Sequence, residues 1–160
     1  MALDIKPVGG YAFPRFRPEK GAKPARKTAS ERGRQRDEAH LALVRRLPCV
    51  ASGSMANVEA AHLRFSEDQF GKVSPGRAKP SDEWVLPLCH AEHMRQHAMG
   101  ERDYWAQLGI EPLKIAQRLY GISAALRASR EPEKDIIRHM TGIVERARAE
   151  ATGEPIGRGK

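Results

Sequence analysis

Apolar and polar positions along the chain separate short strand-like runs from longer helical stretches. Residues 58–65 and 84–88 are apolar-rich runs short enough for β-strands. Pro87 has no amide N–H, which confines the second run to an edge or an end of a sheet. The intervening residues 66–83 are rich in Gly, Pro, Ser and charge, which is typical of a loop.

Helical periodicity begins directly after the second run. Residues 89–99 make the first helical stretch, and Gly100 is a typical stop. Apolar residues three and four apart predict further helices at 101–108, 112–128 and 132–150. Two strands and a long loop, followed at once by a helix, predict an α+β fold with the order strand, strand, helix.

The N-terminal part differs in character from the rest of the chain. Residues 1–28 combine Pro, Gly and basic side chains without an apolar period, and we expect a disordered arm. Ser30 suits the N-cap of a helix that runs to about Leu47 and ends at Pro48. The predicted segments are an arm at 1–28, a helix at 29–48, a strand-strand-helix module at 49–112, C-terminal helices at 113–150 and a flexible tail at 151–160.

The distribution of charge along the chain indicates a candidate binding partner. The 160 residues carry a formal net charge of +8. Residues 1–48 alone hold twelve Lys and Arg against five acids, a net of +7. A basic flank beside a nearly neutral domain suits a polyanion such as DNA, because neutralised phosphates release counterions. The alternative is a tail that only improves solubility.

Two further patterns bear on the compartment. The chain has no apolar run of the roughly 18–20 residues that span a bilayer, and its N-terminus lacks the apolar core of a secretory signal. Its two cysteines are too few for a disulfide scaffold. We therefore expect a cytoplasmic protein with reduced thiols.

The histidines carry the candidate chemistry. The run CHAEHMRQH places His90, His93 and His97 within eight residues. On a helix, His93 and His97 are four residues apart and project from one face, which suits two imidazoles that hold one divalent ion. Such a pair also occurs by chance on surface helices. It is not the zinc-protease motif, because Met94 stands where that motif needs glutamate.

His62 strengthens the case, since it lies in the first strand-like run. A hairpin packed on the histidine helix would bring this strand beside His93 and His97. An imidazole with a near-neutral pKa can take a proton from a water that attacks a phosphodiester. The alternative is a capping or half-buried strand histidine without a chemical role.

A family resemblance is carried by an ordered set of short motifs within residues 49–112. The chain is similar to HNH (ββα-metal) nucleases related to the phage recombination-enhancement nuclease. The matching motifs are Ala61-His62, Lys79-Pro80-Ser81-Asp82, Pro87-Leu88-Cys89, the pair His93 and His97, Gly100-Glu101, Tyr104-Trp105 and Gly109-Ile110-Glu111-Pro112.

The resemblance implies a ββα-metal module that cuts or nicks DNA and takes part in recombination or DNA processing, in a phage or other mobile element. It implies that His62 is the general base and that His93 and His97 bind Mg²⁺ or Mn²⁺, or else Zn²⁺ or Ni²⁺. Asp82 falls where the family's middle Asn or Asp orients the base or reaches the metal.

The sequence departs from the family at two places. Many members carry a metal-binding Asp or His just before the base, where this chain has Ala61. Glu67, Asp68, Asp82 or His62 itself could complete a metal shell, and a ligating His62 could not be the base. Relatives often bind a structural zinc, and the matching positions here are Cys49, Ser52, Cys89 and Glu92. With half of those ligands gone, the alternative is that the two cysteines pack side by side as small apolar residues.

Basic side chains near the site complete the set of candidates. Arg64, Lys72, Arg77 and Lys79 flank it and could clamp phosphates, or could belong to a solvated loop. The rival to a nuclease is a catalytically silent protein that keeps the fold and binds nucleic acid.

Overall fold

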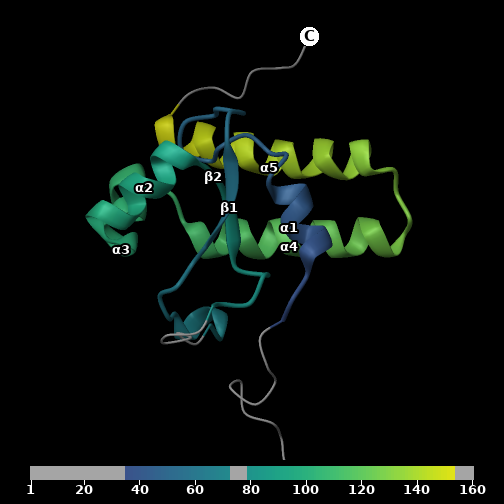
Figure 1. Ribbon diagram of the computed structural model, residues 1–160, viewed down its shortest axis with the longest axis horizontal. Helices are drawn as coiled ribbons and strands as arrows, with labels where there is room; N and C mark the ends of the chain where they lie inside the picture. Colours follow the sequence, from purple (N-terminus) through teal and green to yellow (C-terminus); the bar gives the residue numbers. More distant parts are fainter. Residues whose placement is uncertain (1–34, 73–78, 154–160) are drawn as a thin grey trace, which may run out of the picture.

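Five α-helices and one two-stranded antiparallel sheet make up the part of the chain described by the computed structural model, residues 35–72 and 79–153 (Figure 1). This confirms the α+β class. The elements are α1 (Glu38–Val44), β1 (Val58–His62), a 3₁₀ turn η1 (Asp68–Phe70), β2 (Val85–Cys89), α2 (His90–Met99), α3 (Glu101–Leu108), α4 (Pro112–Ala128) and α5 (Glu133–Thr152).

The two strands of the sheet differ in burial: β2 lies inside the core and β1 lies at its edge. β1 and β2 pair with Ala60 opposite Pro87 and His62 opposite Val85. All five residues of β2 are buried, whereas only Ala61 is fully buried in β1. A two-stranded sheet has only edge strands, which is why Pro87 is tolerated. The carbonyl of Pro87 accepts a 2.8 Å hydrogen bond from the amide of Val50.

β1 ends at His62, three residues before the end of the predicted run. The amide of Leu63 still donates to the carbonyl of Trp84. The next two amides, of Arg64 and Phe65, donate instead to the carboxylate of Glu101 at 2.9 and 3.2 Å. Strand pairing stops because a side chain of α3 has taken the donors that a longer ladder would need.

α1 begins at Glu38, well after the predicted start. Its N-cap is Asp37, whose Oδ1 accepts from the amide of His40 at 2.9 Å. Residues 35–37 are not helical and α1 ends at Val44, so the predicted helix over 29–48 is wrong at both ends of its described part. Ser30 and the arm at 1–28 lie outside the described residues.

The other helices agree closely with the predicted stretches. α2 ends at Gly100, with φ +90°, and α3 ends at Gly109 in the left-handed region. α5 runs to Thr152, so the predicted flexible tail starts too early; residues 154–160 lie outside the described part. None of the described helices is long and apolar enough to cross a membrane.

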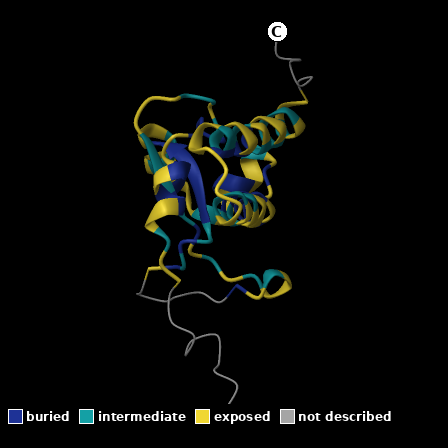
Figure 2. Ribbon diagram, turned by 90° about the vertical axis from the view of Figure 1, so that its right-hand side faces the viewer, coloured by how far each residue is buried: buried dark blue, intermediate teal, exposed yellow. Residues whose placement is uncertain are grey.

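Two long helices back the sheet and form most of the frame. α4 and α5 lie side by side, with α2 and α3 on one side of the sheet and α1 on the other (Figure 1). Figure 2 shows buried residues concentrated in the strands and on the inward helix faces. The largest fully buried side chains include Tyr104, Leu47, Leu86, Leu119 and Met140. This core fixes α2 and α4 relative to the strands that carry the candidate site.

Candidate active site

The direction of α2 follows from the hairpin that precedes it. α2 starts at the residue after β2, and because β1 and β2 are antiparallel, it turns back and runs alongside β1. The amide of His90 donates to the carbonyl of Asn57 just before β1, and His97 shares a pocket with His62 at the end of β1. The histidines of α2 are therefore spread along the length of one strand.

His62 is held by a buried carboxylate. Its Nε2 lies 2.9 Å from Oδ1 of Asp82, whose side chain is 3% exposed. A carboxylate only accepts hydrogen bonds, so the proton of the neutral ring is on Nε2, and Nδ1 is the basic nitrogen. The structure thus brings His62 and Asp82 together, as the resemblance implied.

A small pocket adjoins the exposed side of His62. It measures about 100 Å³, which is room for several water molecules. Its walls come from β1, the segment after it, α2 and the start of α3, and they are His62, Arg64, Gln96, His97, Gly100 and Glu101. A general-base candidate, an imidazole of α2 and a guanidinium therefore face one space.

Glu59 in β1 links the strand to the histidines of α2. Its Oε2 lies 2.6 Å from Nδ1 of His93, and its Oε1 lies 2.8 Å from Nδ1 of His90. The hydrogen bond from His93, then that from His90, lowers the pKa of the Glu59 carboxyl. A carboxylate on Nδ1 fixes the tautomer of a histidine and leaves Nε2 as the nitrogen that can bind a metal. His93 has this arrangement.

His93 and His97 form a side-by-side imidazole pair. Their ring centroids are 4.8 Å apart and the rings are inclined by 35°. Within the described ranges, no group of three or more His, Cys, Asp or Glu side chains is placed to hold a metal ion. Two imidazoles suit an ion such as Zn²⁺ or Ni²⁺, which would have to take its other ligands from water or substrate.

The acids considered for a fuller metal shell have other positions. Asp82 contacts His62, as described above. Glu67 pairs through its backbone with Lys72, and its carboxylate lies 3.8 Å from the guanidinium of Arg102. Asp68 is exposed in η1. None of the three joins His93 and His97 in a cluster among the residues described.

The four basic candidates differ in placement. Arg64 is exposed and lines the pocket, and Lys79 is exposed. Lys72 is only 2% exposed, its Nζ donates to the carbonyl of Phe65, and burial lowers its pKa. The side chain of Lys72 therefore supports the loop from inside and does not face a substrate as expected. Arg77 lies outside the described residues.

Three of the four positions that match a structural zinc site gather in space. Cys49 and Cys89 are both buried free thiols. Ser52 contacts both, with its amide 3.5 Å from Sγ of Cys49 and its Oγ 3.6 Å from Sγ of Cys89. Burial would raise the pKa of the Cys49 thiol, but hydrogen bonds from Ser52 and from backbone amides outweigh it and lower that pKa.

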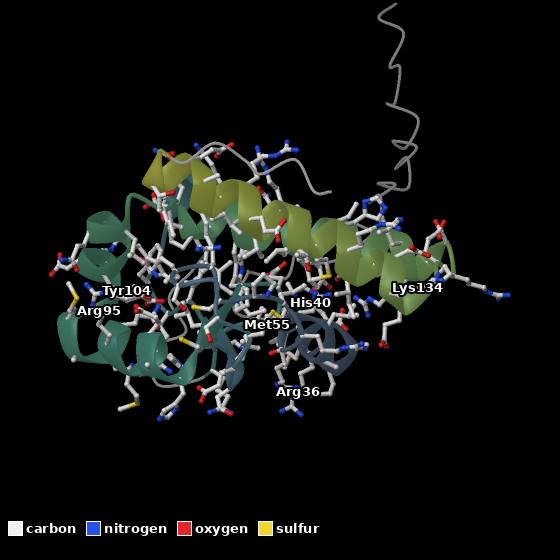
Figure 3. All side chains as sticks on the ribbon, turned by 90° about the horizontal axis from the view of Figure 1, so that it is seen from above. Arg36, His40, Met55, Arg95, Tyr104 and Lys134 are labelled. Atoms are coloured by element: carbon white, nitrogen blue, oxygen red, sulfur yellow. The ribbon has the colours of Figure 1, made fainter. Side chains whose placement is uncertain are left out.

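Glu92, the fourth of these positions, is engaged elsewhere. Its carboxylate accepts a 2.9 Å hydrogen bond from the hydroxyl of Tyr104, and burial together with this carboxylate raises the pKa of Tyr104. Arg95 lies over the Tyr104 ring at 5.9 Å, and the two side chains are labelled in Figure 3. The carboxylate of Glu92 is thus hydrogen-bonded to Tyr104, while Cys49, Ser52 and Cys89 contact one another.

Two acids that matter to the site, Glu59 and Glu101, were given no role from the sequence, although Glu101 is part of the motif Gly100-Glu101. Glu59 is a charged residue inside an otherwise mostly apolar run, and Glu101 is an acid in the first turn after Gly100. Both positions can be recognised in the sequence, but the residues that Glu59 and Glu101 contact are 31 to 37 positions away in the chain.

Comparison with known proteins does not add a relative: no family model, curated protein or solved structure matches this chain. The case for a function rests on the geometry of the site itself.

Proposed function

We propose that this protein is a metal-dependent DNA endonuclease, in which His62 assists the attack of water on a phosphodiester. One observation carries the proposal. His62, held at Nε2 by the buried carboxylate of Asp82, shares its pocket with His97 and Arg64.

His62 would act through Nδ1, the nitrogen that Asp82 leaves available. This atom would accept the proton of the attacking water, and the carboxylate of Asp82 would stabilise the resulting imidazolium while it keeps the ring in one orientation. In this proposal His62 is the base and not a metal ligand, because it forms no metal-holding cluster with His93 and His97 among the described residues.

His93 and His97 would hold the divalent ion, Mg²⁺, Mn²⁺, Zn²⁺ or Ni²⁺, with Glu59 fixing the ring of His93. A bound divalent ion supplies electrostatic stabilisation of the charge that develops on phosphoryl and leaving oxygens. Two protein ligands make the affinity low, so activity should depend on added metal.

DNA as the substrate is supported by charge. The net +7 of residues 1–48 supplies sequence-independent affinity, and the exposed Arg64 and Lys79 would contact phosphates near the pocket. A place in DNA processing or recombination, in a phage or other mobile element, would agree with the family that the motifs resemble.

The test is conversion of supercoiled plasmid to nicked or linear forms by purified protein with Mg²⁺, Mn²⁺ or Ni²⁺. We expect His62→Ala and His93→Ala to abolish cleavage. His139→Ala, which removes an exposed histidine of α5, is the matched control and should cleave normally. Cleavage that persists in both site variants would exclude this mechanism.

A silent nucleic-acid-binding protein is the second candidate. It is favoured by Ala61, which is fully buried where many HNH enzymes carry a ligand, and by the two-histidine donor set. Retarded migration of plasmid without cleavage under every metal would select it.

A further inference from the structure

Residues 35–37, here called the strap, lie across the turn that carries Asp82. The amide of Asp82 donates to the carbonyl of Gln35 at 2.9 Å, and the amide of Gln35 donates to Oγ of Ser81 at 3.2 Å. In the same segment, the amide of Asp37 donates to Oδ2 of Asp82 at 2.9 Å. The strap therefore fixes both the backbone and the side chain of Asp82.

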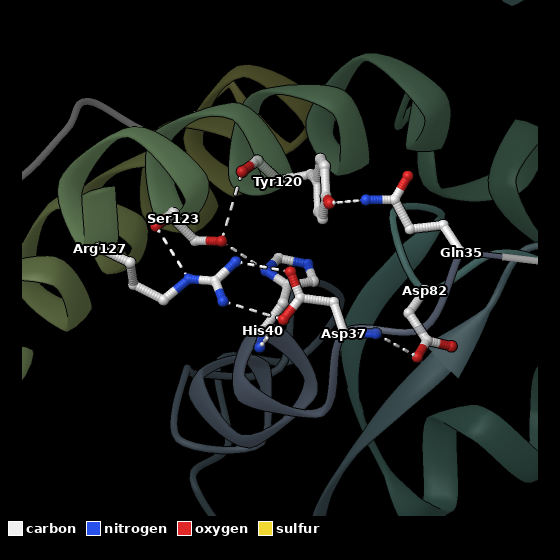
Figure 4. A network of polar contacts seen from close by, with 7 residues as sticks. All are labelled: Gln35, Asp37, His40, Asp82, Tyr120, Ser123 and Arg127. Atoms are coloured by element: carbon white, nitrogen blue, oxygen red, sulfur yellow. Dashed lines mark hydrogen bonds and ion pairs between the residues drawn. The ribbon is translucent and has the colours of Figure 1, made fainter.

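One polar face of α4 holds the strap. Tyr120, Ser123 and Arg127 follow each other at spacings of three and four, so they share a face of the helix. Figure 4 shows all three turned toward α1 and the strap. Gln35 donates to the hydroxyl of Tyr120, and Oγ of Ser123 lies 2.7 Å from Nδ1 of His40.

The strongest of these links is between Arg127 and Asp37. The guanidinium donates to both carboxylate oxygens, at 2.9 Å to Oδ1 and 2.6 Å to Oδ2. The two side chains are 28% and 15% exposed, so water screens the pair only in part. A bidentate pair fixes orientation as well as distance. Arg127 thereby helps to hold Asp37, and with it the amide that donates to Asp82.

The pair of Arg127 and Asp37 is connected to His62 through the last side-chain torsion angle of Asp82. The last side-chain torsion of an aspartate has a broad energy profile, so an unrestrained carboxylate samples many orientations. The two oxygens of Asp82 move together, and fixing Oδ2 against the amide of Asp37 also fixes Oδ1 against Nε2 of His62.

We propose that Arg127 is a positioning residue for His62 and acts through Asp37 and Asp82. This inference rests on the proposed role of His62 as base. Arg127 is not among the residues that line the pocket, so we expect it to influence cleavage through this chain of contacts. The chain joins α4, the strap, the turn before β2 and the end of β1.

The experiment is NMR of the full-length protein with ¹⁵N-labelled histidine rings, combined with plasmid cleavage. In the wild type, the Nε2 proton of His62 should be visible because its hydrogen bond to Asp82 protects it from exchange. Asp82→Asn defines the signal of a disrupted pair. Arg127→Gln should weaken or remove the proton signal and lower kcat about tenfold, with KM for DNA unchanged.

Two variants control for folding and for loss of charge. Arg138→Gln removes an ion pair of α5, with Asp135, that does not contact Asp82, and it should leave the His62 signal and kcat at the wild-type values. Asp37→Asn retains a capping oxygen for His40 but loses the bidentate pair, and it should reproduce Arg127→Gln if that variant does not fold.

Three results decide the matter. The proposal is overturned if Arg127→Gln and Asp37→Asn leave the protected proton of His62 unchanged. It is also overturned if Arg127→Gln lowers kcat equally in the wild-type and Asp82→Asn backgrounds, because Arg127 would then act by another route. If the wild type cleaves no DNA, the NMR result still tests the positioning, and only the proposed function fails.

Discussion

Nε2 of His62 and Oδ1 of Asp82 lie 2.9 Å apart, although the two residues are 20 positions apart in the sequence. The carboxylate is almost fully buried and the imidazole reaches a pocket, so one partner is rigid and the other is accessible. This is the arrangement that a general base requires: a fixed tautomer, a fixed ring and one nitrogen that can take a proton.

Replacement of Asp82 by Asn should slow DNA cleavage. The amide is neutral and cannot stabilise a protonated His62, so we expect the rate to fall about 10- to 100-fold, as for other partners that orient a catalytic or ligating histidine. Initial rates of plasmid nicking at saturating metal would measure this. Glu83→Asn, at the neighbouring position, is the control, and equal rates in the two variants would contradict the prediction.

Replacement of Glu59 by Gln should weaken metal binding more than it weakens the fold. The variant loses the carboxylate that holds Nδ1 of His93, and we expect a 10- to 100-fold lower affinity for Mn²⁺ or Ni²⁺ by calorimetry. Glu145→Gln makes the same charge change on an exposed site of α5 and should bind as the wild type does. Unchanged affinity in Glu59→Gln would remove His93 from the metal site.

His40 should make stability depend on pH. Burial, which outweighs the nearby carboxylates of Asp37 and Asp82, lowers the pKa of His40 to about 4 from 6.5. Between these values the unfolded chain binds a proton that native His40 does not, so stability falls as the pH falls from 6.5 to about 4. Above pH 6.5 both states are neutral and the effect is absent.

The size of this effect can be measured with His40→Gln. The wild type should lose up to about 3 kcal/mol more unfolding free energy than the variant between pH 6.5 and pH 4. Urea denaturation at several pH values gives the two curves, with His139→Gln as a control for an exposed histidine. Parallel curves for the wild type and His40→Gln would show that His40 does not titrate as described.

Removal of residues 1–28 should reduce the salt dependence of DNA binding. The segment holds seven Lys and Arg, and if all of them contact phosphates, the slope of log Kd against log salt falls by up to about 6. Fluorescence anisotropy over a range of NaCl concentrations would measure the slope. Deletion of residues 154–160, with two basic residues, should change it by less than about 2. An unchanged slope would assign the arm a role in solubility alone.

Elements with local signals were predicted well from the sequence. The end of α2 at Gly100, the end of α3 at Gly109 and the start of α4 at Pro112 each depend on the backbone preferences of a single residue. The pairing of β1 with β2 followed from two apolar runs around a polar loop. His93 and His97 were assigned to one helix face by spacing alone, and they do lie side by side.

Features that depend on distant partners were missed. The start of α1 at Asp37 reflects contacts with Arg127, 90 residues away, and with Asp82, 45 residues away. Likewise β1 ends early because the carboxylate of Glu101, 37 residues from Arg64, accepts the amide hydrogen bond of Arg64. Local propensity does not contain these contacts, since each is created only when the helices pack against the sheet.

The strap has a consequence for how the protein can be divided. A fragment limited to residues 49–112, which contains every recognisable motif, would retain His62 and Asp82 but leave Oδ2 of Asp82 without the amide of Asp37. Adding the strap alone would not restore it, because Arg127 lies beyond the fragment on the other side. The segment that holds Asp82 in place therefore extends at least from Gln35 to the end of α4, about one and a half times the length of the segment that holds its motifs.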